Sequence, residues 1–156
     1  MTTFGFYHLT RLSLEDALAK LLVKTVQSGE RALVRLGPNV DMEGLDRALW
    51  TFDDASFLPH GKAADARAPR QPVLLAKADA CACGENPNGA GMLFLVDDPP
   101  VDDAGIFARC FYLFDGRDPD AVEAARRRWR DVGVRGWQRR YWQQDENGRW
   151  QNRAAG

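Results

Sequence analysis

The sequence lacks long apolar runs, and it has few of the residues that build disulfide or metal frameworks. Its apolar stretches fall far short of the roughly 20 residues that a transmembrane helix requires. The N-terminus carries no basic segment followed by an apolar core, so no secretory leader is visible. Three cysteines are an odd number and do not suit a disulfide framework. We therefore expect a cytoplasmic protein that does not contact a membrane.

The glycine-rich phosphate-binding motifs of nucleotide enzymes are also missing. No G-x-x-x-x-G-K-[ST] sequence occurs, and the turn at residues 8–13, after the first expected strand, contains no glycine. The glycine-rich segment 84–91 precedes an expected strand rather than a helix, so it is interpreted as a turn. Cys81, Cys83 and Cys110 lack the paired spacing of a zinc site. We expect no cofactor and no metal, and the role of the three thiols stays open.

Charge is nearly balanced overall but unevenly distributed along the chain. The formal net charge is −1, so the molecule as a whole has no electrostatic preference for nucleic acid. Acidic residues are concentrated in residues 79–103, whereas arginines dominate residues 126–140. This asymmetry indicates an anionic partner for the C-terminal part of the chain.

Hydrophobic periodicity predicts alternating strands and helices. The expected strands cover residues 3–9, 31–36, 72–76, 91–96 and 108–114. Ser13 is expected to cap the first helix, with Asp16 completing a variant of the capping box. Asn39 is expected to cap the second helix, and the last helix runs from about Pro119 to about Gly133.

The order of these elements predicts the fold class and the domain organisation. Strands that alternate with helices are typical of an α/β fold with a mostly parallel sheet. We expect a single Rossmann-like domain over residues 1–137, with helices on both faces of the sheet and no nucleotide-binding loop. Residues 138–156 are expected to form a basic C-terminal extension, whose degree of order the sequence leaves open.

The segment Leu45–Gly61 is unusually apolar for a helix end and the loop that follows it. Trp50 ends the expected helix, and Phe57 is one of several large apolar residues beyond it. A loop normally avoids such residues, because an aromatic ring left in water forgoes several kcal/mol of burial. Either this loop folds back onto the core, or it presents an apolar surface to another protein.

The same segment contains the residue types of a hydrolytic triad. Ser56, His60 and the pair Asp53 and Asp54 lie close together in sequence, whereas triad members are normally far apart. No G-x-S-x-G elbow supports Ser56 as a nucleophile. We interpret these residues as turn formers and expect no catalytic residue. A small nucleotide-binding or hydrolytic α/β enzyme is the alternative.

The last expected helix carries the clearest candidate binding surface. Its buried stripe is formed by four residues at helical spacing: Val122, Ala125, Trp129 and Val132. Arg126 and Arg130 lie beside Trp129 at the edge of this stripe, whereas Arg127 is expected to pair with Glu123. Two unpaired guanidinium groups beside an aromatic ring suit a terminal carboxylate or an acidic, apolar peptide. A merely basic helix surface is the alternative.

Several of these segments together resemble the chi subunit of bacterial DNA polymerase III holoenzyme. The most specific match is the block L-D-R-A-L-W at Leu45–Trp50, closely followed by S-F-L-P-H at Ser56–His60. Weaker matches are F-G-F-Y-H-L at Phe4–Leu9, A-R-R-R-W-R at Ala125–Arg130, and Gly136 followed by an aromatic residue. The resemblance covers most of the chain.

The resemblance implies a Rossmann-like, non-catalytic subunit that links the clamp loader to single-stranded-DNA-binding protein (SSB) during DNA replication. By match to the family, Arg126, Trp129 and Arg130 would bind the acidic, Phe-ended C-terminal tail of SSB. Trp50 and Phe57 would face the psi subunit or another clamp-loader component. DNA would then be contacted indirectly, through SSB. Direct DNA binding through the arginine-rich tail is a further alternative.

Overall fold

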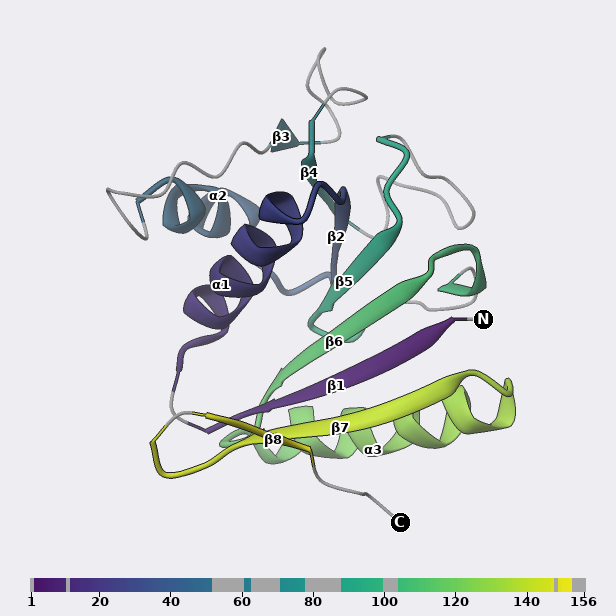
Figure 1. Ribbon diagram of the computed structural model, residues 1–156. Helices are drawn as coiled ribbons and strands as arrows, with labels where there is room; N and C mark the ends of the chain where they lie inside the picture. The colour runs from purple at the N-terminus through teal and green to yellow at the C-terminus, as the bar shows by residue number, and fades with distance from the viewer. Residues whose placement is uncertain are drawn as a thin grey trace.

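The computed structural model describes residues 2–10, 12–51, 61–62, 71–77, 88–99, 104–147 and 149–152, with side chains at all of them except 50, 61 and 62. These residues form one sheet with helices on both faces (Figure 1). In the part of the chain that is described, no helix is both long and apolar enough to cross a membrane.

The sheet is mostly parallel, as the alternation of elements predicts. Its strands are β1 (Thr3–Leu9), β2 (Ala32–Leu36), β3 (Gly61–Lys62), β4 (Val73–Lys77), β5 (Met92–Val96), β6 (Arg109–Asp115), β7 (Gln138–Gln144) and β8 (Trp150–Asn152). They lie in the order β3-β4-β2-β5-β6-β1-β7-β8. Every neighbouring pair is parallel except β7 and β8. The predicted α/β, Rossmann-like fold class is confirmed.

The three α-helices are α1 (Leu14–Gln27), α2 (Met42–Thr51) and α3 (Pro119–Val134), and a short 3₁₀ helix, η2, covers Ala104–Ile106. Ser13 caps α1 as predicted, because its side chain accepts a hydrogen bond from the Asp16 amide at 3.2 Å. Gly29 follows the helix with a φ of 82°, a conformation that favours glycine. Helix α2 and its end near Trp50 are confirmed, but the predicted cap was wrong: the helix begins at Met42, and the backbone amide of Asn39 donates to the Asp97 carboxylate.

Helices pack on both faces of the sheet, so the central strands carry apolar side chains on both faces. One face packs against α1 and α2 through residues that include Leu18, Leu22, Leu45 and Phe94. The other face packs against α3 through residues that include Phe6, Tyr112, Ala125 and Val132. Figure 1 shows α3 beneath β1 and β7, away from α1 and α2. The molecule therefore presents two different helix–sheet surfaces.

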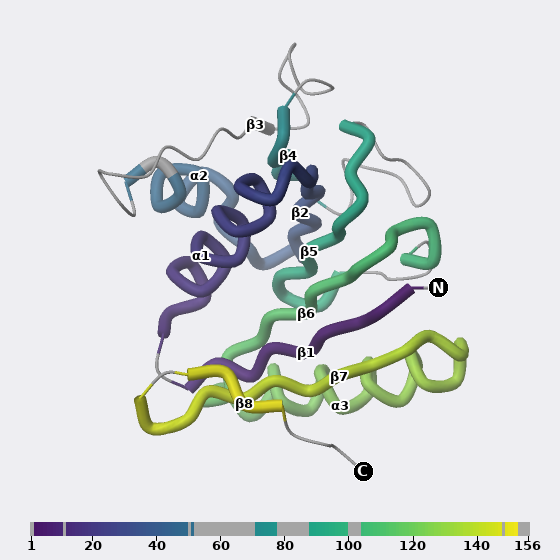
Figure 2. The backbone as a smooth tube through the Cα atoms, viewed as in Figure 1, coloured from purple at the N-terminus to yellow at the C-terminus, as the bar shows by residue number. Residues whose placement is uncertain are grey.

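Strand β7 extends the sheet beyond the domain boundary that the sequence predicts at residue 137. It pairs in parallel with β1, with Tyr7 opposite Trp142, and Figure 2 shows β1 between β6 and β7. The boundary therefore does not separate the sheet from the segment 138–144. Because side chains alternate along a strand, Tyr141 packs on the α3 side and Trp142 on the α1 side.

Candidate functional site

Helix α3 is held on the sheet by its cap and by its apolar stripe. Asp118 precedes the helix and accepts a hydrogen bond from the Asp120 amide at 3.0 Å, with Pro119 as the first helical residue. The predicted stripe is confirmed: Ala125 and Val132 are buried, and Val122 and Trp129 are partly buried against the same core. This packing fixes the rotation of the helix on the sheet, and so determines on which edge of the helix each arginine lies.

One edge of α3 is closed by a network of charges. Arg128 donates to the Asp98 carboxylate at 2.9 Å, and the Tyr112 hydroxyl donates to the same oxygen at 3.0 Å. Burial, followed by the negative charge of Asp98, raises the pKa of Tyr112 far above its usual range. Asp98 therefore accepts hydrogen bonds from both Arg128 and Tyr112. These bonds join this edge of the helix to β6 and to the turn after β5.

The opposite edge of α3 carries two arginines without carboxylates. Arg126 and Arg130 are exposed, lie one turn apart, and have no ion-pair partner among the described residues. The predicted pair of Arg127 with Glu123 is present at 4.0 Å. Among the arginines of this helix, the two that the sequence singles out are thus the ones without a carboxylate partner in the described part of the chain.

Trp129 is a packing residue as well as a candidate contact residue. Its ring meets Phe6 edge to face at 5.2 Å between centroids and Tyr141 at 5.9 Å. The Arg139 guanidinium lies 4.4 Å from the ring centroid and donates to the Trp129 carbonyl at 2.8 Å. Trp129 therefore wedges α3 against β1 and β7, and only part of its surface reaches solvent.

A polar pair extends this edge onto the sheet. The Tyr141 hydroxyl and the Nδ1 atom of His8 are joined by a hydrogen bond of 2.5 Å. Burial lowers the pKa of His8, opposed by the Asp115 carboxylate, and burial raises the pKa of Tyr141, opposed by the charge of Arg126. The charge of Arg126 thus acts on Tyr141, so the helix edge and the β7 surface lie close together.

Sequence reasoning missed the contribution of β7 to this site. Arg139 and Tyr141 lie in the segment that was expected to be an extension of the domain, yet both contact Trp129. Residues 138–144 show no simple apolar alternation; only once they are known to form a strand does the period of two place Arg139 and Tyr141 on one face and Arg140 and Trp142 on the other.

The second predicted surface falls largely outside the described residues. Trp50 lies in the last turn of α2, but its side chain is not described. Seven further residues named above also lie outside the described ranges: Asp53, Asp54, Ser56, Phe57, His60, Cys81 and Cys83. Cys110 is described, and it is a buried thiol that donates to the Ala104 carbonyl at 3.7 Å.

A cavity of about 630 Å³ lies beside the N-terminal ends of α1 and α2, next to the carboxyl end of β5. This is the region where open α/β sheets commonly bind ligands. Its lining includes the acidic residues Glu15, Asp41 and Asp97, and no lysine or arginine is among the lining residues that the structure describes. Three carboxylates repel a phosphate, so the cavity does not favour the nucleotide-binding alternative.

Comparison with known proteins gives a consistent result. The model of the family described as DNA polymerase III chi subunit, HolC, matches residues 1–140, which include β1 to β6, α3 and the first part of β7. The chain is also 27% identical over 106 residues to a protein of Rickettsia prowazekii (strain Madrid E) named "Probable DNA polymerase III subunit chi". That alignment covers 68% of this chain and 60% of the relative.

Proposed function

This chain belongs to the DNA polymerase III chi subunit family, and from that premise we propose that it is a non-catalytic accessory subunit that binds the C-terminal tail of SSB. In this role it couples SSB to the clamp loader during DNA replication in the cytoplasm. The tail is acidic and ends in phenylalanine, so its receptor must offer cations beside an apolar wall. Helix α3 and β7 together provide both.

The observation that carries this proposal is the unmatched pair Arg126 and Arg130. Both guanidinium groups are exposed and without a carboxylate among the described residues, whereas Arg127 and Arg128 on the same helix have carboxylate partners. A guanidinium group presents several N–H donors in a geometry that matches a carboxylate. In the proposed complex, Arg126 and Arg130 hold the acidic residues or the terminal carboxylate of the tail.

Trp129 and Tyr141 supply the apolar wall. Trp129 keeps part of its ring accessible beside Arg130, although Arg139 lies over it. We place the terminal phenylalanine of the tail against this accessible part, next to the partly exposed ring of Tyr141. DNA is reached indirectly in this scheme, through the SSB that coats it.

Fluorescence anisotropy with a labelled peptide of the SSB tail tests the proposal. Arg130→Ala should weaken binding by roughly tenfold, since a hydrogen bond to a charged group contributes about 1.5 kcal/mol at the lower end of its range. Arg127→Ala is the matched control, because it removes the same charge from an exposed position that already has a partner. Added salt should also weaken binding of the peptide to the unmodified protein. Equal affinity of Arg130→Ala and the unmodified protein would refute the assignment.

We further propose that Trp50 and Phe57 form the surface that docks the psi subunit or another clamp-loader component. Trp50 lies in the last turn of α2, which packs near β4, whereas α3 packs on β1, β6 and β7, so one subunit could hold both partners at once. Trp50→Ala and Phe57→Ala should reduce co-elution with the clamp-loader assembly of the same organism in size-exclusion chromatography. Both variants should bind the SSB tail peptide normally, and co-elution at the unmodified level would contradict this proposal.

The enzymatic alternative has a direct test. A ligand present at 100 times its Kd should stabilise the protein by about 2.7 kcal/mol, which a thermal-shift screen detects readily. On our proposal, no nucleotide raises the melting temperature, because the cavity beside α1 and α2 is lined by carboxylates. A clear rise with one nucleotide would favour the alternative.

A further inference from the structure

A second surface of the molecule, on the face opposite α3, combines aromatic and basic side chains in a groove. The groove is a cavity of about 380 Å³ between α1 and the strands β1, β6, β7 and β8. A neighbouring cavity of about 200 Å³ continues it along the sheet, and the two share Tyr7, Arg109, Phe111 and Trp142. Neither the tail-binding proposal nor the family match assigns a role to this groove.

The floor of the groove is a row of aromatic rings on three adjacent strands. The ring of Tyr7 in β1 is inclined by only 28° to that of Phe111 in β6 and by 15° to that of Trp142 in β7. Gly5 makes this possible, because a Cβ at that position would lie 2.9 Å from the Tyr7 ring. Trp150 in β8 meets Tyr7 edge to face at 5.1 Å, and it closes one end of the row.

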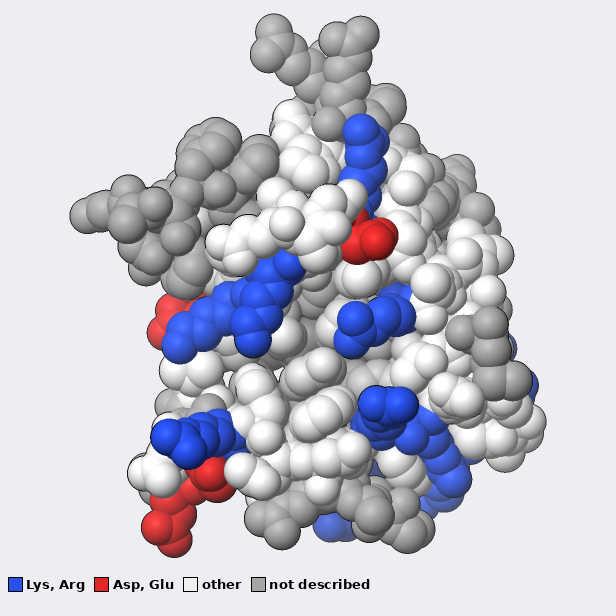
Figure 3. Space-filling view, in the orientation of Figure 1, with Lys and Arg blue, Asp and Glu red and all other residues white. Residues whose placement is uncertain are grey.

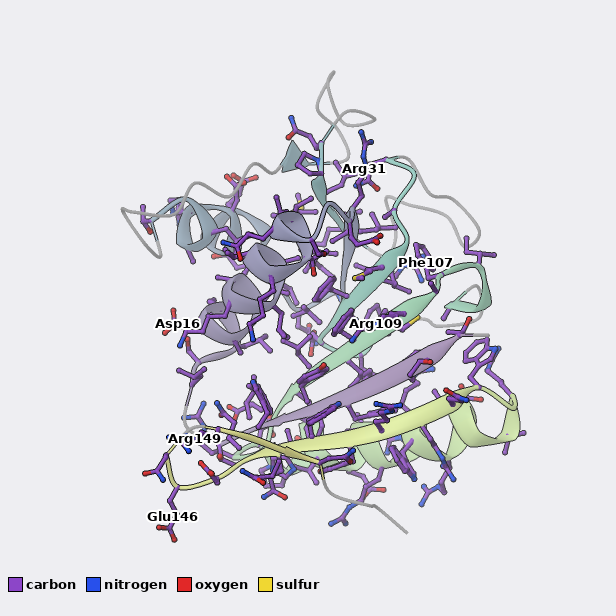
Figure 4. The ribbon with its side chains drawn as sticks, viewed as in Figure 1. Asp16, Arg31, Phe107, Arg109, Glu146 and Arg149 are labelled. Atoms are coloured by element: carbon purple, nitrogen blue, oxygen red, sulfur yellow. The ribbon has the colours of Figure 1, made fainter. Side chains whose placement is uncertain are left out.

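Three cations surround this aromatic floor. Lys24 of α1, Arg109 of β6 and Arg140 of β7 are exposed and line the two cavities, and none of them has a carboxylate partner within the described ranges. The described residues of the lining include no aspartate or glutamate. Figure 3 shows basic side chains around the hollow, with the acidic ones outside it. In Figure 4, Arg109 lies centrally on this face, while Asp16 and Glu146 lie at its left margin.

We propose that this groove binds a single strand of DNA directly. Single-stranded nucleic acid is bound where a positively charged groove tracks the phosphates and aromatic side chains stack on the bases. The near-parallel rings of Tyr7, Phe111 and Trp142 share one orientation, as successive stacked bases do. Because the chain belongs to a family of DNA polymerase III subunits, the strand is DNA.

The position of the groove excludes a peptide that would add a strand to the sheet. A peptide adds to a sheet by pairing with the free backbone groups of an edge strand. The floor here is the face of β6, β1 and β7, and each of these strands is already paired with a neighbour on both sides. The occupant is therefore held by side chains alone, through charge and stacking.

Anisotropy with a fluorescein-labelled oligothymidylate of about 15 nucleotides tests the proposal, a length near the upper end of common site sizes. The double variant R109Q/R140Q should weaken binding several-fold and reduce the slope of log K against log salt by roughly 1.4, at about 0.7 for each phosphate contact. The matched control is R126Q/R130Q, which removes the same charge from α3. It should bind the oligonucleotide normally and lose the SSB tail peptide instead.

A second variant separates stacking from charge. Trp142→Ala should weaken oligonucleotide binding by roughly 5- to 150-fold, whereas Trp142→Phe should retain most of the affinity. Circular dichroism confirms that each variant is folded, and Trp142→Phe serves as the folded reference if Trp142→Ala is not. Failure of the unmodified protein to bind the oligonucleotide, or equal affinity of R109Q/R140Q and R126Q/R130Q, would overturn the inference. Neither result would affect the tail-binding proposal, which rests on the other face.

Discussion

The two edges of α3 differ in how they treat charge. On the edge that faces the turn after β5, Arg128 and Tyr112 both bond to Asp98, so the charged and polar groups are matched within the fold. On the edge that faces β7, Arg126 and Arg130 are exposed and have no carboxylate among the described residues. One helix thus has a structural edge and an edge whose charges remain available.

This difference shows why an inventory of arginines is a poor guide to a binding site. Arg126, Arg127, Arg128 and Arg130 are neighbours in sequence and chemically identical. The helical period directs Arg128 towards Asp98 and leaves Arg126 and Arg130 on the side of Tyr141. A guanidinium group already held by a carboxylate gains little from a second one, so the unmatched arginines are the receptor candidates.

The largest expected effect on stability comes from removing the Trp129 side chain, which packs between α3 and β7. Trp129→Ala should lower the free energy of unfolding by about 3 kcal/mol, because the partly buried ring packs on Phe6 and Tyr141 and the loss of a core Phe or Trp side chain costs about 3 to 5 kcal/mol. Urea denaturation followed by circular dichroism measures this loss. Trp129→Phe is the control and should cost considerably less. A loss below about 1 kcal/mol for Trp129→Ala would show that Trp129 is not part of the core.

Breaking the structural edge should have the next largest effect. Asp98→Ala leaves the Tyr112 hydroxyl and the Arg128 guanidinium without their shared acceptor, and it should cost about 2 kcal/mol, since the pair is only partly buried. Glu123→Ala, which breaks an exposed pair, should cost less than about 0.5 kcal/mol. Both variants should bind the tail peptide with unchanged affinity. A several-fold loss of affinity in Asp98→Ala would erase the distinction between the two edges.

The smallest of these effects is a pH dependence on the β7 side. Burial lowers the pKa of His8 in the folded protein, so the unfolded chain takes up the proton at a higher pH. The stability that His8 contributes is complete above its unfolded pKa of about 6.5 and is lost as the pH falls through the lower, folded value. NMR titration of the two histidines, assigned with His8→Gln, should show the lowered value. A His8 pKa above 6.5 would contradict the described environment.

Much of the fold could be predicted because its signals are local. The strand Thr3–Leu9, the Ser13 cap and the stripe of α3 follow from periodicity and capping alone, and the structure confirms all three. Strand β7 was not predicted, because Gln and Arg occur on both of its faces and leave no simple apolar alternation. Its partner is β1, at the other end of the chain, so only the tertiary fold identifies it as a strand.

The candidate site was predictable only in part, for the same reason. Arg126 and Arg130 could be selected from the helical period. They are four residues apart and carry like charges, so they cannot pair with each other. The pairing of Arg128 with Asp98 spans 30 residues of sequence, and the contact of Arg139 with Trp129 joins a helix to a strand. Neither contact leaves a signal in local sequence, and both are needed to tell the closed edge from the open one.

The open edge of α3, with Arg126 and Arg130, is the surface that we propose binds the SSB tail. Isothermal titration calorimetry with intact SSB from the same organism, comparing Arg126→Ala/Arg130→Ala with Arg127→Ala, tests it most directly. We predict that the double variant loses most of its affinity, by well over tenfold, and that Arg127→Ala binds as the unmodified protein does. Equal affinities for the two variants would contradict the account.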